Sequence, residues 1–208
     1  MKERKIQHAR TVVQLGALAF LVILLQQGRV QIFFLLFAGA GIIGSLFFGR
    51  VYCGWLCPMG TLLRGQTWVF KTFRIRRKSI SPLPFLRWLV LAGTVALVIV
   101  TNRSGQQMLL MPMMILASLL VSLFVHEAFW HRSVCPFGAL LSLAGKKSMR
   151  SIQISEASCI GCGACQRVCP AGSIGEKEEK IRYNSSKECL VCRACIPACP
   201  TKAITYES

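Results

Sequence analysis

The stretch "CIGCGACQRVCP", residues 159–170, decides the fold of the C-terminal part of the chain. A second copy, "CLVCRACIPACP", follows at residues 189–200 with the same C-x2-C-x2-C-x3-C-P spacing. Three closely spaced thiolates wrap around one inorganic cluster, whereas the fourth, which precedes a proline, cannot reach the same cluster. Zinc ribbons use pairs of C-x2-C instead of a duplicated four-cysteine run. The repeat therefore predicts a small module that is built around two metal clusters.

This doubled run closely resembles the bacterial two-cluster ferredoxins. The resemblance implies two 4Fe-4S clusters, each held by three cysteines of one copy and the last cysteine of the other. Disulfides are disfavoured because the charge pattern described below places this module in the cytoplasm. By the family pattern the first cluster is held by Cys159, Cys162, Cys165 and Cys199, and the second by Cys189, Cys192, Cys195 and Cys169.

The N-terminal part of the chain is dominated by apolar runs. Of the 208 residues, 53% are hydrophobic, and none is an aspartate. Each run is near the lower length limit for a helix that crosses ~30 Å of hydrocarbon. The predicted fold class is a membrane α-helical domain of four transmembrane helices, residues 1–148, followed by a small α+β ferredoxin-like domain, residues 149–208. The four runs are Thr11–Gln27, Val30–Phe48, Phe85–Thr101 and Met108–Val125.

The distribution of charge orients the predicted spans. The net charge is +17, but residues 1–148 hold 17 Lys and Arg against two Glu, and the remainder holds 8 against six. The basic residues gather at the N-terminus, between the second and third runs, and after the fourth run. The positive-inside rule then places both termini in the cytoplasm of a cell whose inner membrane carries the protein. The basic excess indicates contact with the lipid bilayer and excludes a nucleic-acid footprint.

A second repeat joins the two halves of the membrane domain. "YCGWLCPMGTLL", residues 52–63, corresponds to "WHRSVCPFGALL", residues 130–141, with His131 in the place of Cys53. Each copy follows an even-numbered run, which predicts two tandem two-span units that end in C-x3-C-P and H-x3-C-P motifs. Proline suits the first position of a helix, so Cys57 and Cys135 are predicted N-caps, where the helix dipole favours a thiolate.

Three interpretations of the leftover set Cys53, Cys57, Cys135 and His131 stay open. The four side chains ligate a third metal centre, since an imidazole is a reasonable replacement for a thiolate at an iron–sulfur centre. Alternatively, Cys53 and Cys57 form a redox dithiol with His131 as a quinone or proton partner. In the third interpretation all four are buried structural residues. Counting the iron in anaerobically purified protein separates the first interpretation from the other two.

The combination of features resembles the NapH/MauN-type membrane iron–sulfur proteins, with NosR-type proteins and the cytochrome oxidase assembly protein CcoG sharing parts of the plan. The resemblance implies electron transfer between the quinone pool and partner redox subunits, as the electron-transfer subunit of a quinol dehydrogenase. The alternative is a CcoG-like maturation factor that donates electrons during the assembly of another metalloenzyme. The chain departs from the family pattern at His131, where the family has Cys.

The sequence offers few other chemical sites. It lacks a C-x-x-C-H haem motif, a dinucleotide fingerprint and a Walker loop. His126 and Glu127, at the cytoplasmic end of the fourth run, are the candidates for a quinone site; the alternative is that this polar pair simply lies at the membrane interface. The partner enzyme and the direction of electron flow are not encoded in recognisable motifs.

Overall fold

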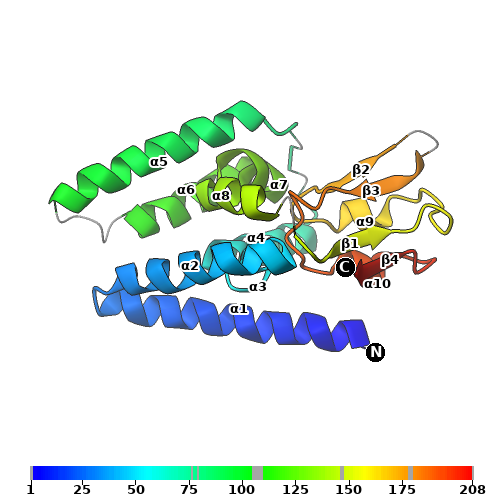
Figure 1. Cartoon of the computed structure of the whole chain (residues 1–208), viewed down its shortest axis with the longest axis horizontal. Helices are drawn as coiled ribbons and strands as arrows, with labels where there is room; N and C mark the ends of the chain where they lie inside the picture. The colour runs from blue at the N-terminus through cyan, green and yellow to red at the C-terminus, as the bar shows by residue number, and fades with distance from the viewer. Residues whose placement is uncertain are drawn as a thin grey trace.

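The computed structural model describes residues 2–75, 77–78, 80–104, 110–145, 148–177 and 180–207. A body of helices occupies one end of the molecule and a small module with short strands the other (Figure 1). The elements are α1 (Lys2–Gln26), α2 (Val30–Phe48), α3 (Val51–Trp55), α4 (Pro58–Thr72), α5 (Pro84–Ser104), α6 (Leu110–Phe124), α7 (Glu127–Phe129), the π-helical turn η2 (Trp130–Val134), α8 (Pro136–Ala144), β1 (Ser151–Ile154), α9 (Ala164–Arg167), β2 (Ile174–Glu176), β3 (Arg182–Asn184), α10 (Cys195–Ala198) and β4 (Ile204–Glu207).

Each of the four apolar runs forms a helix, namely α1, α2, α5 and α6. The start of the fourth predicted run, at Met108, lies outside the described residues. Within the described ranges, one helix segment, Glu3–Gln26, is both long and apolar enough to cross a membrane. The apolar segments Gly39–Phe48, Phe85–Thr101 and Pro112–Phe124 are shorter. The structure therefore supports the helices themselves, whereas the number of membrane spans stays a prediction.

Helix α1 begins at Lys2, well before the predicted start of the first apolar run at Thr11. The additional turns contact the C-terminal module. Gln7 Nε2 donates a hydrogen bond to the Cys192 carbonyl oxygen at 2.9 Å, and Glu3 pairs with Arg193 at 2.8 Å. The apolar run marks the candidate membrane span, and the helix continues beyond it because tertiary contacts stabilise its polar N-terminal turns.

The two Cys-Pro motifs start helices as predicted. Cys57 is the N-cap of α4 and Cys135 is the N-cap of α8, and in each helix proline occupies the first turn. The Cys135 Sγ accepts a hydrogen bond from the Gly138 backbone N–H at 3.4 Å. Both sulfur atoms therefore lie where the positive end of a helix stabilises a thiolate.

The C-terminal module contains two antiparallel strand pairs, β1 with β4 and β2 with β3. Its core combines apolar and sulfur-bearing side chains: Ile152, Ile174 and Ile204 are almost fully buried and pack with the cysteines. Such a small core leaves little apolar area to bury, so clusters bound by these cysteines would supply much of the stability.

The internal repeat of this module extends to backbone conformation. Left-handed residues recur at intervals of thirty positions, within or just after each copy of the cysteine run. Three of them are glycines in or just after the first copy, which adopt this conformation freely. The three corresponding residues in or just after the second copy have side chains, for which the conformation is unfavourable. The three pairs are Gly161 (φ 68°) and Val191 (φ 50°), Gly163 (φ 69°) and Arg193 (φ 57°), and Gly172 (φ 59°) and Lys202 (φ 55°). The second copy therefore keeps the loop geometry at the expense of strain, which is typical of ligand-holding loops.

Candidate metal centres

The first predicted cysteine set gathers around one cavity at the outer end of the module. Ile154 and Ile204 form part of its apolar wall. Cys162 is exposed, whereas Cys165 is buried. The set that lines this cavity is Cys159, Cys162, Cys165 and Cys199. Three of these cysteines lie in one loop and the fourth comes from the other copy, so the arrangement fits a 4Fe-4S cluster.

The second predicted set lines a separate cavity nearer the helices. Its members are Cys169, Cys189, Cys192 and Cys195. Backbone N–H groups point at two of the sulfur atoms: Val191 N lies 3.4 Å from Cys189 Sγ, and Ser173 N lies 3.4 Å from Cys169 Sγ. Burial raises the pKa of Cys189 to about 12. Buried thiolates need a compensating positive charge, which the iron of a cluster provides, so this set also fits the cofactor.

The three leftover cysteines also lie together. Cys53 comes from α3, Cys57 from the start of α4 and Cys135 from the start of α8. All three have free thiols. Burial raises the pKa of each one, and the charge of Cys53 raises the pKa of both Cys57 and Cys135 further. The two Cys-Pro motifs of the helical body therefore converge on one buried, thiol-rich site.

His131 joins this site from the π-helical turn η2, where it is buried to 4% exposure. It lines the same cavity as Cys53. Burial, followed by the charge of Arg50, lowers the pKa of His131 to about 3. The imidazole is therefore neutral, which is the form that binds metal. Single π-turns within helices occur often at functional sites, because they re-aim side chains.

The spacing of the ligand side chains limits what they can hold. Across the described ranges, no three His, Cys or Glu side chains form a group that could hold a single metal ion. A four-iron cluster is several ångströms across and spans thiolates that are too far apart to share one ion. Each of the two ferredoxin sets surrounds a cavity of its own, as a cluster requires.

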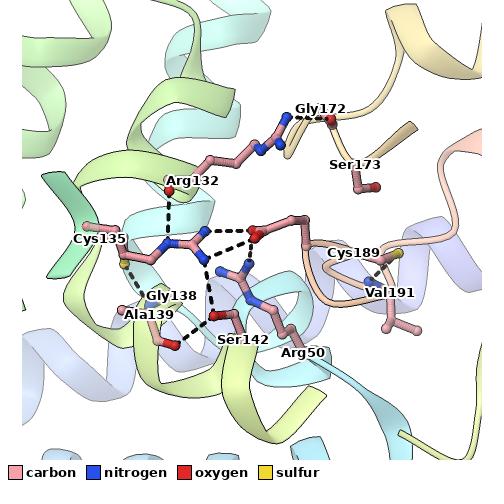
Figure 2. A network of polar contacts seen from close by, with 12 residues as sticks. Arg50, Arg132, Cys135, Gly138, Ala139, Ser142, Gly172, Ser173, Cys189 and Val191 are labelled. Atoms are coloured by element: carbon pink, nitrogen blue, oxygen red, sulfur yellow. Dashed lines mark hydrogen bonds and ion pairs between the residues drawn. The ribbon is translucent and has the colours of Figure 1, made fainter. Parts of the chain in front are cut away.

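A buried ion network joins the leftover site to the second cysteine set (Figure 2). Glu188, which precedes Cys189, accepts hydrogen bonds from Arg87 Nη2 at 2.7 Å and Nη1 at 3.0 Å, and from Arg50 Nη1 at 3.2 Å. The side chains of Arg50, Arg87 and Glu188 are 0%, 6% and 10% exposed. Two cations thus share one carboxylate away from water, an arrangement that depends on every partner being present.

Direct backbone contact connects the same two regions. A Cβ built on Gly54, between Cys53 and Cys57, would overlap the carbonyl oxygen of Leu190. The Trp55 indole Nε1 donates a hydrogen bond to the Val191 carbonyl oxygen at 3.1 Å. Cys53 and Leu190 also belong to one hydrophobic cluster with Cys192. Glycine is required at position 54 because the cluster loop lies against the backbone of α3.

His126 and Glu127 line different cavities, so the structure does not bring the predicted quinone pair together. Glu127 and His131 line a cavity of about 330 Å³ that Cys53 and Leu190 also line. His126 lines a second cavity beside Cys169, and its Nδ1 accepts a hydrogen bond from Ala128 N at 3.3 Å. The two residues diverge because His126 is the N-cap of α7, whereas Glu127 is its first residue.

The cavity around Glu127 is flanked by basic side chains. Burial raises the pKa of Glu127 to about 7, although Thr67, Arg77, Lys71 and Arg10 act in the opposite direction. The carboxyl is therefore neutral below about pH 7 and ionised above it. A carboxyl that titrates near neutral pH can accept a proton from a substrate in the same cavity.

Some functional residues were not identified from the sequence. Arg50 and Glu188 lie 138 positions apart, and nothing in either local pattern predicts that they pair. The one available signal was position: Arg50 lies three residues before Cys53, and Glu188 directly precedes Cys189. Charged residues beside buried ligands affect the electrostatics of the site.

Comparison with protein families agrees with this geometry. A family described as a 4Fe-4S binding domain matches residues 30–79 and 107–155, which include both Cys-Pro motifs of the helical part. A family described as a 4Fe-4S dicluster domain matches residues 151–201. Iron–sulfur domains of the ferredoxin type are therefore present, and one of the two family models covers the leftover cysteines.

Three relatives have related sequences. YccM of Escherichia coli, whose name refers to electron transport, is 27% identical, over 69% of this chain and 47% of its own length. The methylamine utilization ferredoxin-type protein MauN of Methylobacillus flagellatus is 26% identical, over 60% and 50%. The ferredoxin-type protein NapH of Haemophilus influenzae is 26% identical, over 67% and 55%. The chain thus spans about half the length of these relatives. No solved structure matches it.

Proposed function

We propose that this chain, which is an iron–sulfur protein of the NapH/MauN type, carries electrons from membrane quinol to a partner redox protein. The observation that carries the proposal is the cavity of about 330 Å³, because Glu127, Cys53 and Leu190 line it together. A substrate bound there would contact a proton acceptor, the leftover thiol site and the loop of the second ferredoxin set.

The residues divide the work between holding cofactors and handling protons. The two ferredoxin sets hold the 4Fe-4S clusters, which supply one-electron transfer when bound. Oxidation of a quinol to a quinone releases two electrons, one for each of the two ferredoxin clusters, and two protons, of which one passes to solvent water. We assign one proton to the Glu127 carboxylate, which accepts it at an oxygen, while Thr67 and Lys71 orient the carboxyl from α4. His126, in the other cavity, has no part in this step.

The proposal places the helical body in the membrane, with both termini and the C-terminal module on the cytoplasmic side. Large apolar side chains on α1, α2, α5 and α6 are exposed, which water disfavours and lipid accepts. Examples are Leu15 at 57%, Ile43 at 63%, Val100 at 62% and Met113 at 63% exposure. Trp68 on α4, at 69%, suits the membrane–water interface, from which quinol would enter the cavity that this residue also lines.

Among the three interpretations of the leftover set we favour a third metal centre, because a 4Fe-4S binding family spans both Cys-Pro motifs. Cys53, Cys57, Cys135 and His131 supply three thiols and a neutral imidazole, and the 4Fe-4S binding family covers both motifs. A protein with this centre contains about twelve irons, and a protein with the two ferredoxin clusters alone contains about eight. Iron and acid-labile sulfide analysis of anaerobically purified protein distinguishes the two compositions.

The function is tested by adding a quinol analogue to the protein in proteoliposomes and recording the EPR signal of reduced clusters. We expect quinol to produce the signal in the unaltered protein, and Glu127→Gln to slow its appearance at least about tenfold, as loss of a proton acceptor does. Dithionite provides the control for intact clusters. If dithionite reduces the clusters but no quinol does, the quinol proposal is wrong and the maturation-factor alternative gains support.

A further inference from the structure

We propose that Arg10 binds a substrate oxygen in the cavity that Glu127 lines, and that it stabilises the negative charge that develops on this oxygen when a quinol is oxidised. The inference rests on the proposed function, because it presupposes that a quinol enters this cavity. It adds a second substrate contact, which comes from α1, and it names the protein group that each of the two quinol oxygens meets.

Arg10 is a buried cation in the wall of the cavity. It is 6% exposed and lies in the segment Glu3–Gln26, the candidate membrane span. None of the ion pairs between described residues includes it. A buried charge without a counter-charge is costly, and an ionisable residue in a membrane span typically marks the path of a substrate. The occupant of the cavity is therefore expected to supply an electron-rich acceptor.

Hydrogen bonds fix the position of the Arg10 guanidinium. Its Nε donates to the Gly54 carbonyl oxygen at 2.7 Å, and Gln14 Nε2 donates to the same oxygen at 3.1 Å. Its Nη1 lies 3.5 Å from Gln7 Oε1, which is the upper limit for a hydrogen bond. Among the described residues, Nη2 has no hydrogen-bond acceptor. The guanidinium is thus attached to α3 through Nε, and Nη2 is available to an oxygen in the cavity that Arg10 lines.

The same contacts connect Arg10 to the loop of the second ferredoxin set. Gln7, one turn earlier on α1, donates from Nε2 to the Cys192 carbonyl oxygen at 2.9 Å. The backbone of Gly54 lies directly against the Leu190 carbonyl oxygen. Figure 1 shows this end of α1 beside α10, which belongs to the same module. A substrate oxygen that accepts from Arg10 is therefore joined to the second ferredoxin set by a short series of direct contacts.

The chemistry of a quinol suits this pair of residues. A quinol has two hydroxyl oxygens at opposite ends of one ring, and the Glu127 carboxylate accepts the proton of one of them. A guanidinium is always protonated, so Arg10 acts on the other oxygen as a hydrogen-bond donor only. The proton of that oxygen passes to solvent water, and Arg10 stabilises the negative charge that this leaves. The product quinone keeps a carbonyl acceptor here, so Arg10 binds substrate and product alike.

Arg64 provides a matched control, because it is an arginine that lines the same cavity. Its Nη1 donates to Gln14 Oε1 at 2.8 Å, so it belongs to the same hydrogen-bond network as Arg10. Arg64 is only half-buried, and water therefore solvates its remaining N–H groups. Replacing Arg64 removes one positive charge and one network contact from the cavity, but it leaves the buried donor of Arg10 in place.

The experiment measures the binding of duroquinone, a quinone without a lipid tail, to the oxidised full chain in detergent. Binding is followed by the quenching of tryptophan fluorescence, since Trp68 lines the cavity. Arg10→Gln is expected to raise the Kd at least about tenfold, as loss of a hydrogen bond from a charged donor does. Arg64→Gln is expected to stay within about threefold. Arg10→Lys is expected to fall between them, because lysine keeps the charge but loses the planar donor fork. Iron content and reduction by dithionite show that each variant retains its clusters.

The outcomes separate this inference from the proposed function. If duroquinone gives no saturable quenching in the unaltered protein, the quinol cavity itself is wrong, and the role of Arg10 is wrong with it. If the unaltered protein binds duroquinone and Arg10→Gln loses less than about tenfold in affinity, or Arg64→Gln loses as much, the Arg10 inference alone is wrong. If Arg10→Gln does not retain its iron, Arg10→Lys decides: a loss of at least about threefold supports the contact, and a smaller loss contradicts it.

Discussion

Replacing Glu188 with alanine is expected to destabilise the junction between the helical body and the C-terminal module more than any surface substitution. The change removes three hydrogen bonds, with donor–acceptor distances of 2.7, 3.0 and 3.2 Å. It leaves Arg50 and Arg87 as buried cations without a counter-charge. Breaking a buried ion pair by deleting one partner costs about 3–5 kcal/mol of stability. Because two arginines lose their counter-charge here, we expect a cost near the upper end of that range.

The assay is guanidinium unfolding of the protein in detergent, followed by the loss of cluster absorbance. Glu188→Ala is expected to lower the free energy of unfolding by about 4–5 kcal/mol, and Glu188→Gln by about half, since the amide keeps one acceptor. Glu156→Ala is the control, because Glu156 pairs with Lys177 at the surface, where the two side chains are 58% and 54% exposed. A change there is expected to stay within about 0.5 kcal/mol. Equal midpoints for Glu188→Ala and Glu156→Ala would refute the reasoning.

Three further predictions concern the centres and the cavity. Gly54→Ala is expected to push the loop at Leu190 away from α3 and to lower the free energy of unfolding by about 1–3 kcal/mol in the same assay. Gly65→Ala is the control, because a Cβ at this position meets nothing within 4 Å, and it is expected to be neutral or slightly stabilising. The rate of quinol oxidation in proteoliposomes is expected to rise with pH through about 7, because the pKa of Glu127 is raised to about 7 and only its ionised form accepts a proton. Glu127→Gln is expected to lack this rise. The same pH profile in the variant and the unaltered protein would contradict the role of Glu127 as proton acceptor. Cys57→Ser is expected to reduce the iron content from about twelve to about eight with the ferredoxin EPR signals retained, and an unchanged iron content would exclude Cys57 as a ligand of a third cluster.

Local patterns in the sequence were sufficient to predict much of the fold. The apolar runs predicted helices that the structure contains, and the proline after Cys57 and Cys135 predicted both N-caps correctly. These features depend on neighbouring residues, whose spacing is directly visible. Hydropathy does not reveal that α1 extends back to Lys2, because its polar first turns are held by contacts with a module almost two hundred residues away, such as Glu3 with Arg193.

The site was predictable in its ligands but not in its surroundings. The resemblance of the repeat to two-cluster ferredoxins correctly implied which cysteines line each cavity. The pairing of Arg50 with Glu188 depends on tertiary packing, which no sequence window contains. His126 and Glu127 are adjacent in the sequence, which suggested one site. Helix α7 begins between them, and their side chains line separate cavities.

At the left-handed loop positions the two copies of the cysteine run carry different residues, and the two copies therefore make different contacts. The first copy, residues 159–170, has glycine at positions 161 and 163, and its Cys162 is exposed to solvent. The second copy, residues 189–200, has Val191 and Arg193 at the corresponding positions, also with positive φ. These two residues attach this copy to Trp55 and Glu3 of the helical body. Duplication has thus produced one half that anchors and one half that faces outward. For the proposed function, an electron acceptor therefore has access to the outward half while the contacts at Trp55 and Glu3 stay in place.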